Sequence, residues 1–141
     1  MSHHKPDPNK SVNLTIDGIP VTVPEGTTIL EAAKTVGVKI PVLCHHPDVQ
    51  VRAVCRLCVV ECDGSSKLKA ACANDVWEGV SVVTDNERLR GIRKMILELI
   101  LAEHPQDCLA CIRNQTCELQ ALAHPFGTYT RCLFYPSDAA H

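Results

Sequence analysis

Eight residues that bind soft metal ions well fall into two sets of four along the chain. The first set is made of cysteines alone, and the second starts with a histidine: Cys44, Cys55, Cys58 and Cys72, then His104, Cys108, Cys111 and Cys117. Thiolate and imidazole ligands in sets of four suit two iron–sulfur clusters, and they also suit two structural zinc ions. The sequence therefore predicts two metal centres.

The spacing within the first set favours iron. Only two residues separate Cys55 from Cys58, so one tight loop can present both thiols, whereas Cys44 and Cys72 must be brought in by the fold. A zinc ribbon normally offers two such close pairs, and this set has one. The pattern is similar to a plant-type [2Fe–2S] spacing with a longer first gap. Structural zinc remains the alternative.

The cysteine content also bears on the compartment. The chain has 9 cysteines in 141 residues, and its polar N-terminus lacks the apolar stretch of a secretory signal. An odd number of thiols in a reducing compartment argues against a disulfide framework. The longest apolar run, 95–102, contains Glu98 and is too short for a bilayer. We expect a cytoplasmic protein without direct membrane insertion.

Composition and motifs exclude several classes of function. A net charge of −2 and 4% aromatic residues argue against nucleic-acid binding. The seven glycines form neither a dinucleotide fingerprint nor a Walker A loop, so we expect no NAD(P) or flavin bound by this chain itself. No Ser-His-Asp set or paired-carboxylate site is evident. We therefore predict that the chain has no catalytic site of its own.

The first half of the chain reads as a small mixed sheet on one helix. Two alternating runs, 12–16 and 19–23, are joined by Asp17-Gly18, a strong hairpin signal. Thr28 and Glu31 have the spacing of a capping box for a helix that ends at Gly37. Further short strands are expected at 58–61, 67–71 and 80–83.

The second half reads as helical. Thr84 and Glu87 have capping-box spacing, and a helix is expected from about Asp85 to Glu103. Its apolar face is expected to hold Leu89, Ile92, Ile96, Leu99 and Ile100. This helix delivers His104, and a short helix is expected over 117–123. We predict a polar tail at 1–10, one domain at 11–83 and a second at 84–141.

Two motifs carry a family resemblance from about Val12 to Ala123. The first motif comprises residues 40–46 and 55–61. The second comprises residues 104–120 and contains the sequence Cys-Ile-Arg-Asn-Gln-Thr-Cys-Glu-Leu-Gln. They resemble the N-terminal iron–sulfur region of the large iron–sulfur subunit of NADH–quinone oxidoreductase. A similar region forms the N-terminus of many [FeFe]-hydrogenases, formate dehydrogenases and subunits of electron-bifurcating NAD(P) complexes. The sequence of the second motif is closer to that of the hydrogenase and electron-bifurcating members than to that of respiratory NADH–quinone oxidoreductase.

The resemblance implies an α+β fold and two cofactors. A β-grasp ferredoxin-like domain would carry one [2Fe–2S] cluster on the first four cysteines. A small helical domain would then carry one [4Fe–4S] cluster on the histidine and three cysteines of the second set. The family usually has glycine where this chain has Ala53 and Gln115, each two residues before a ligand. Amide hydrogen bonds to sulfur tune the reduction potential of a cluster. We therefore expect this chain to share the family's ligand residues more closely than its reduction potentials.

The resemblance also implies a function. The chain would relay electrons between a flavin- and NAD(P)-binding subunit and a second redox subunit of a multisubunit oxidoreductase, with ferredoxin as a further candidate partner. One alternative is a free ferredoxin-like carrier, which the near-neutral charge disfavours. The other is a zinc-stabilised interaction module.

Several remaining residues are given no chemistry. His3 and His4 are assigned to a polar terminus, and His45, His46 and His124 are expected to be exposed or hydrogen-bonded. Cys62 and Cys132 lie outside both ligand sets, and a spare thiol in such a protein usually packs as a small apolar group. For Cys132 an interface role is kept as a minor alternative.

Overall fold

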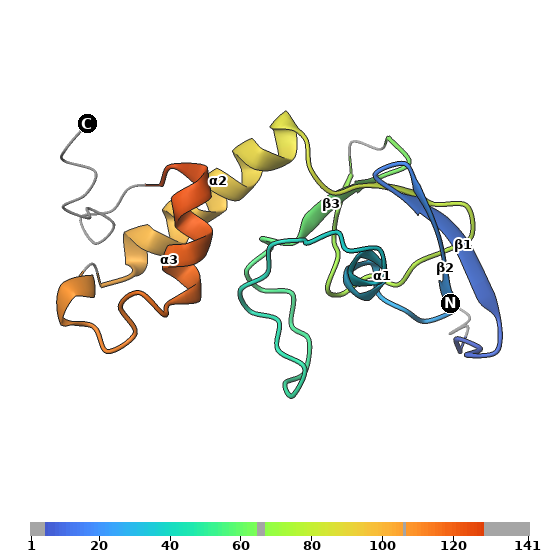
Figure 1. The fold of residues 1–141 in the computed structure, drawn as a ribbon, viewed down its shortest axis with the longest axis horizontal. Helices are drawn as coiled ribbons and strands as arrows, with labels where there is room; N and C mark the ends of the chain where they lie inside the picture. Colours follow the sequence, from blue (N-terminus) through green and yellow to red (C-terminus); the bar gives the residue numbers. More distant parts are fainter. Residues whose placement is uncertain (1–4, 65–66, 106, 129–141) are drawn as a thin grey trace. The chain divides into compact units, whose positions relative to one another are not determined.

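The computed structural model describes residues 5–64, 67–105 and 107–128. The elements in chain order are β1 (Ser11–Ile16), β2 (Ile19–Pro24), α1 (Ile29–Thr35), β3 (Val59–Cys62), β4 (Leu68–Ala70), β5 (Ser81–Val83), α2 (Glu87–Glu103), the 3-10 turn η1 (Cys108–Ala110), α3 (Glu118–Ala123) and the 3-10 turn η2 (His124–Phe126). The chain divides into two compact units, Met1–Leu89 and Arg90–His141 (Figure 1). The expected α+β class is confirmed.

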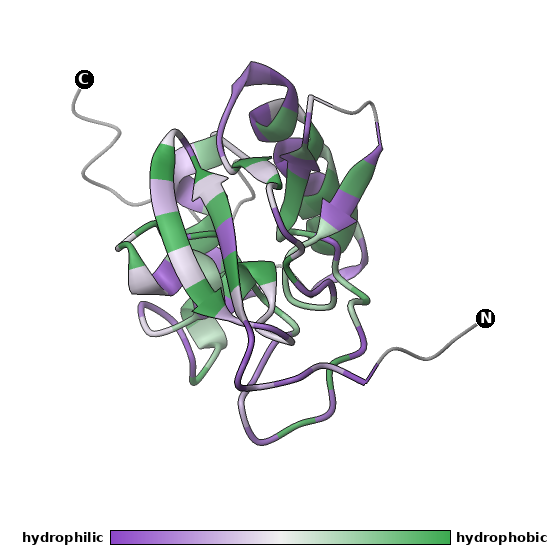
Figure 2. Cartoon of the chain, turned by 90° about the vertical axis from the view of Figure 1, so that its right-hand side faces the viewer, coloured by the Kyte–Doolittle hydropathy of each residue, from purple (hydrophilic) through white to green (hydrophobic). Residues whose placement is uncertain are grey.

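The β1–β2 hairpin forms where the sequence predicts it. Ile16 pairs with Ile19, so only Asp17 and Gly18 remain in the turn. Both turn residues have positive φ angles, 50° and 81°, as a type I′ turn requires. Burial alternates along β1, and Figure 2 shows hydrophobic and hydrophilic bands alternating along the strands.

The five strands form one mixed sheet in the order β2-β1-β5-β3-β4. β1 runs parallel to β5, while β3 is antiparallel to both β4 and β5. Helix α1 packs beside this sheet (Figure 1), and its buried residues Ile29, Leu30, Ala32 and Ala33 share one core with the strands. The cap predicted for this helix is present, because Thr28 accepts a hydrogen bond from the Glu31 N–H at 3.2 Å.

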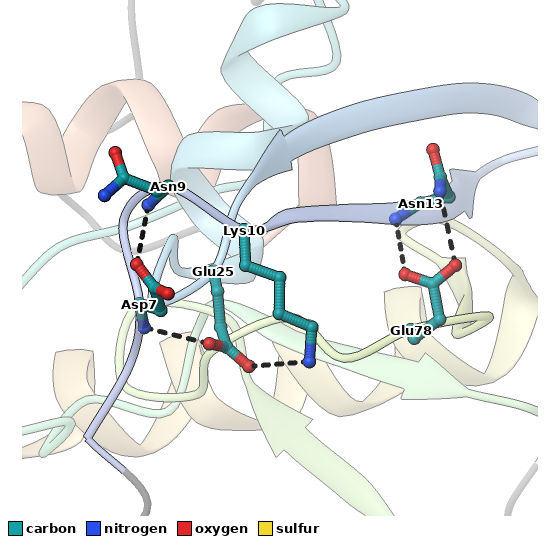
Figure 3. A network of polar contacts seen from close by, with 6 residues as sticks. All are labelled: Asp7, Asn9, Lys10, Asn13, Glu25 and Glu78. Atoms are coloured by element: carbon teal, nitrogen blue, oxygen red, sulfur yellow. Dashed lines mark hydrogen bonds and ion pairs between the residues drawn. The ribbon is translucent and has the colours of Figure 1, made fainter.

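Polar contacts tie the chain before β1 to the end of β2 (Figure 3). The Asp7 N–H donates to the Glu25 carboxylate at 2.9 Å, and Lys10 Nζ lies 3.7 Å from the same carboxylate. On β1, Asn13 donates from its backbone and side chain to Glu78, at 2.9 and 3.3 Å. These two bonds lower the pKa of Glu78. These contacts tie the segment before β1 to Glu25, and β1 itself to Glu78.

The start of α2 differs from the predicted capping box. Thr84 does not cap the helix; its N–H and its hydroxyl both donate to the Asp17 carboxylate in the β1–β2 turn. The helix begins three residues later, where Asn86 Oδ1 accepts from the Leu89 N–H at 2.8 Å. The charged Asp17 carboxylate thus takes the hydrogen bonds of Thr84, and Asn86 caps the helix in its place.

Asn86 should therefore contribute measurably to stability. We expect Asn86→Ala to lower the free energy of unfolding by about 1 kcal/mol, because the Leu89 N–H loses its acceptor. The same change removes the 3.0 Å hydrogen bond from Asn86 to Glu61. Urea unfolding measures the loss, with exposed Lys94→Ala in the same helix as control. An equal loss in both variants would contradict the assignment of the cap.

The buried face of α2 is also rotated from the one predicted. Leu89 is buried as predicted, and the three predicted isoleucines, Ile92, Ile96 and Ile100, are half-buried. Leu99 is instead 65% exposed, and the most buried positions after Leu89 are Arg93, Leu97 and Leu101. These positions form an i, i+4 row that includes a charged residue, which a count of apolar residues does not select. Within the described part of the chain, no helix is both long and apolar enough to cross a membrane.

Candidate metal centres

The pairing of β3 with β4 brings two of the predicted ligands to the same end of a hairpin. Val59 pairs with Ala70, which places Cys58 just before the paired segment of β3 and Cys72 just beyond β4. The Ala71 N–H donates to the Cys58 carbonyl at 3.1 Å, so the two ligand segments are bonded to each other. Both side chains are buried. The hairpin register thus positions half of the first set.

The other half of the first set lies in a long loop. Residues 41–57 contain no helix or strand and extend away from the sheet (Figure 1). Within this loop, the Cys55 N–H donates to Cys44 Sγ and the Leu57 N–H donates to Cys55 Sγ, both at 3.5 Å. Amide donors of this kind stabilise a thiolate and tune a cluster bound to it. The loop is therefore suited to hold thiolate ligands.

The four thiols are close enough to affect one another's ionisation. The pKa of the Cys72 thiol rises to about 12, chiefly through burial, and further because it hydrogen-bonds with Cys58 and is repelled by negative charge on the other three cysteines. Burial also raises the pKa of Cys55, but hydrogen bonds from Leu57 and Cys44 outweigh it, so the net shift is downward. Four thiolates held this closely need a cationic group among them.

The candidate metals differ in how they use four ligands. Among the residues that the structure describes, no three His, Cys, Asp or Glu side chains converge closely enough to hold one metal ion. Tetrahedral zinc needs four ligands around a single ion, whereas a [2Fe–2S] cluster divides four thiolates between two irons.

One histidine beside the first set departs from expectation. His46 Nδ1 accepts from the Asp48 N–H at 3.2 Å, as a hydrogen-bonded side chain should. Nδ1 of His45, by contrast, is buried and has no hydrogen-bond partner in the described part of the chain. Such an atom is rare because burial without a partner costs free energy. His45 directly follows the predicted ligand Cys44. Its unpartnered Nδ1 atom therefore fits a site where a bound group supplies the missing hydrogen-bond partner.

The second set lies within fourteen residues that connect α2 to α3. His104 follows the last residue of α2, Cys108 begins η1, Cys111 follows η1, and Cys117 directly precedes α3. His104 and Cys111 are exposed, while Cys108 and Cys117 are half-buried. The ligand role of all eight residues remains a prediction.

Both positions where the family usually has glycine adopt left-handed backbone conformations. Ala53 has a φ of 50° and Gln115 a φ of 69°. An L-residue is strained there because its Cβ approaches the neighbouring carbonyl oxygen, which glycine avoids. A third ligand-loop residue, Arg56, shares this conformation with a φ of 60°. Both ligand loops therefore adopt backbone conformations that glycine favours, although other residues occupy these positions.

Of the two cysteines outside the ligand sets, the structure describes Cys62 alone. Cys62 lies in β3 and is buried in the core, where burial raises the pKa of its thiol. It is packed as a neutral apolar group, as predicted for a spare thiol. Cys132 lies outside the described residues.

Two family models match the chain in succession. The first, described as a 2Fe-2S iron-sulfur cluster binding domain, matches residues 9–87. The second, described as the NADH-ubiquinone oxidoreductase-G iron-sulfur binding region, matches residues 93–131. The matches confirm the predicted pair of cofactors, one [2Fe–2S] and one [4Fe–4S] cluster.

Several curated proteins are similar over most of the chain. An NADP-reducing hydrogenase subunit of Solidesulfovibrio fructosivorans is 44% identical over 82% of the chain and 21% of its own length. The mitochondrial NADH dehydrogenase [ubiquinone] iron-sulfur protein 1 of Solanum tuberosum is 35% identical over 89% of the chain and 17% of its own length. The NADPH-Fe(3+) oxidoreductase subunit alpha of Geobacter sulfurreducens is 42% identical over 82% of the chain and 14% of its own length. The chain thus spans about a fifth or less of these relatives.

A solved structure shares the fold. The crystal structure of an NAD+-reducing [NiFe]-hydrogenase in the H2-reduced state matches 89% of this chain and 52% of its own chain. The TM-score is 0.78 at 36% sequence identity.

Proposed function

Because the chain belongs to the family of 2Fe-2S iron-sulfur cluster binding domains, we propose that it relays electrons through two clusters within a larger NAD(P)-linked oxidoreductase. The [2Fe–2S] cluster is assigned to the two cysteines at the end of the β3–β4 hairpin and the two in the loop that precedes β3. The [4Fe–4S] cluster is assigned to the segment between α2 and α3. The ligands are Cys44, Cys55, Cys58 and Cys72, then His104, Cys108, Cys111 and Cys117.

The mutual influence of the four thiols in the first unit is the observation that carries this proposal. Burial, the hydrogen bond with Cys58 and the charge of the other three sulfurs raise the pKa of Cys72 to about 12, so four thiolates here would be unfavourable without a cationic group. When bound, a cluster accepts and releases one electron at a time. The chain's own part is to hold the sulfur ligands, supply amide donors to them and limit access of water.

The proposed partners follow from the relatives. The names of these relatives describe hydrogenase, NADH dehydrogenase and NADPH-Fe(3+) oxidoreductase subunits. We assign electron exchange with NAD(P)H to a flavin-binding subunit and the other end of the relay to a second redox subunit, with ferredoxin as a further candidate. The cytoplasm is the proposed location.

The cluster content gives the first test. Protein purified without oxygen should contain about six iron and six acid-labile sulfide per chain, two of each from one cluster and four from the other. Removing iron with a chelator should abolish the visible absorbance and lower the melting temperature, because ligand binding stabilises the folded state. About two zinc per chain without sulfide would instead indicate a structural zinc module.

The relay itself is tested in the native complex. A tagged chain should co-purify with a flavoprotein, and NADH or NADPH should then reduce both clusters, as followed by electron paramagnetic resonance. The isolated chain serves as control, because NAD(P)H alone should leave its clusters oxidised while dithionite reduces them. A chain that purifies alone from its native host and is reduced by ferredoxin would favour a free carrier.

A further inference from the structure

The turn that leads into Cys117 contains a strained residue. Gln115 has a φ of 69°, in the left-handed region that glycine adopts freely and L-residues rarely do. Two overlapping turns are closed by backbone bonds: the turn before Gln115 by Asn114 N–H to the Cys111 carbonyl at 3.1 Å, and the turn that contains Gln115 by Thr116 N–H to the Arg113 carbonyl at 3.0 Å. Strain of this kind persists only where surrounding contacts hold the backbone.

One side chain makes contacts on this turn that can hold it. Gln120 Oε1 accepts from the Gln115 N–H at 2.9 Å, and Gln120 Nε2 donates to Asn114 Oδ1 at 3.0 Å. Gln120 lies in α3, three residues after Cys117, and is half-buried. Both ends of its amide are therefore engaged by consecutive residues of the loop between Cys111 and Cys117. A helix anchored in this way fixes the loop on one side of Cys117.

We propose that Gln120 is a positioning residue for the [4Fe–4S] site, holding the strained turn at Gln115 so that Cys117 is presented in its ligating position. The inference rests on the proposed ligand role of Cys117. The same bond occupies the Gln115 N–H, so this amide would be free to donate to a bound cluster only if the contact were lost. Amide hydrogen bonds and exposure to solvent both affect the potential of a cluster, so Gln120 influences the potential without touching the metal.

Substitutions at the two ends of this contact test the proposal in the full chain. Gln120→Ala removes both hydrogen bonds and should speed the loss of [4Fe–4S] signal to a chelator several-fold. It should also raise the midpoint potential of the remaining cluster, because the Gln115 N–H is released and water gains access. Gln120→Glu keeps an acceptor for the Gln115 N–H and should lie between Gln120→Ala and the unmodified chain.

A second substitution tests whether strain is the reason. Gln115→Gly removes the unfavourable Cβ, so the double variant Gln115→Gly/Gln120→Ala should lose its cluster more slowly than Gln120→Ala alone. The [2Fe–2S] signal in the other unit serves as an internal standard for folding. Lys94→Ala, at an exposed residue of α2 in the same unit as Gln120, is the control and should leave both cluster signals unchanged.

The outcomes separate the proposal from its premise. A Gln120→Ala chain with unchanged potential and unchanged cluster loss would overturn the positioning role. A double variant no better than Gln120→Ala would overturn the strain-based reason, and with it the proposal as stated. An unmodified chain that never shows a [4Fe–4S] signal would instead refute the proposed function. Slower cluster loss in the double variant, with an upward shift of potential in Gln120→Ala, would support the inference.

Discussion

Replacing Cys58 with serine is expected to abolish the [2Fe–2S] cluster and leave the [4Fe–4S] cluster in place. Cys58 is buried beside Cys72, and a serine hydroxyl would replace the thiolate with a poor iron ligand. Iron should fall from about six to about four per chain. Electron paramagnetic resonance of the dithionite-reduced protein would show which of the two signals remains.

Cys62→Ser provides a closely matched control. Cys62 lies four residues away on β3, is equally buried and undergoes the same chemical change, but belongs to neither ligand set. It should retain both clusters even if the added buried hydroxyl lowers the melting temperature. Loss of the [2Fe–2S] signal in both variants would assign the effect to core packing. Loss of both clusters in Cys58→Ser would mean that the two units fold together.

Replacing His104 with cysteine is expected to lower the potential of the [4Fe–4S] cluster while preserving its assembly. A neutral imidazole is exchanged for an anionic thiolate, so the cluster becomes more negatively charged and harder to reduce. In Rieske centres two histidines raise the potential substantially relative to plant-type ferredoxins, which suggests a shift on the order of 100 mV for one ligand. A redox titration followed by electron paramagnetic resonance measures it.

His124→Cys is the control for the new thiol. His124 is exposed, begins η2 and lies in the same unit, but it is not in the ligand set. It should leave the potential unchanged, so a shift found only in His104→Cys would identify the ligand. An unchanged or higher potential in His104→Cys would contradict the assignment of His104.

Local signals predicted much of the first unit correctly. Asp17-Gly18 forms the expected turn, and Thr28 caps α1 through the Glu31 N–H. These signals succeed because the interacting groups lie within four residues of each other, so few competing partners intervene. The two sets of ligand candidates were also evident from the sequence, since metal-binding side chains are few and their spacing is distinctive.

Local signals failed where a distant group competed. Thr84 and Glu87 have good capping spacing, but Thr84 donates to Asp17, which is 67 residues away in sequence. On α2, Leu99 was predicted to be buried and is exposed, while the charged Arg93 is buried. A periodicity count weighs each residue by hydropathy alone, and packing in the folded chain decides which face is covered.

Local periodicity and residue type were enough to predict the fold class, the order of the elements and the candidate ligands. Only the tertiary structure showed that the β3–β4 register brings Cys58 beside Cys72, and that Gln120 engages the strained turn at Gln115. Both depend on side-chain and strand contacts that form after the local elements exist. Their geometry follows from how those elements pack, which spacing along the chain does not specify.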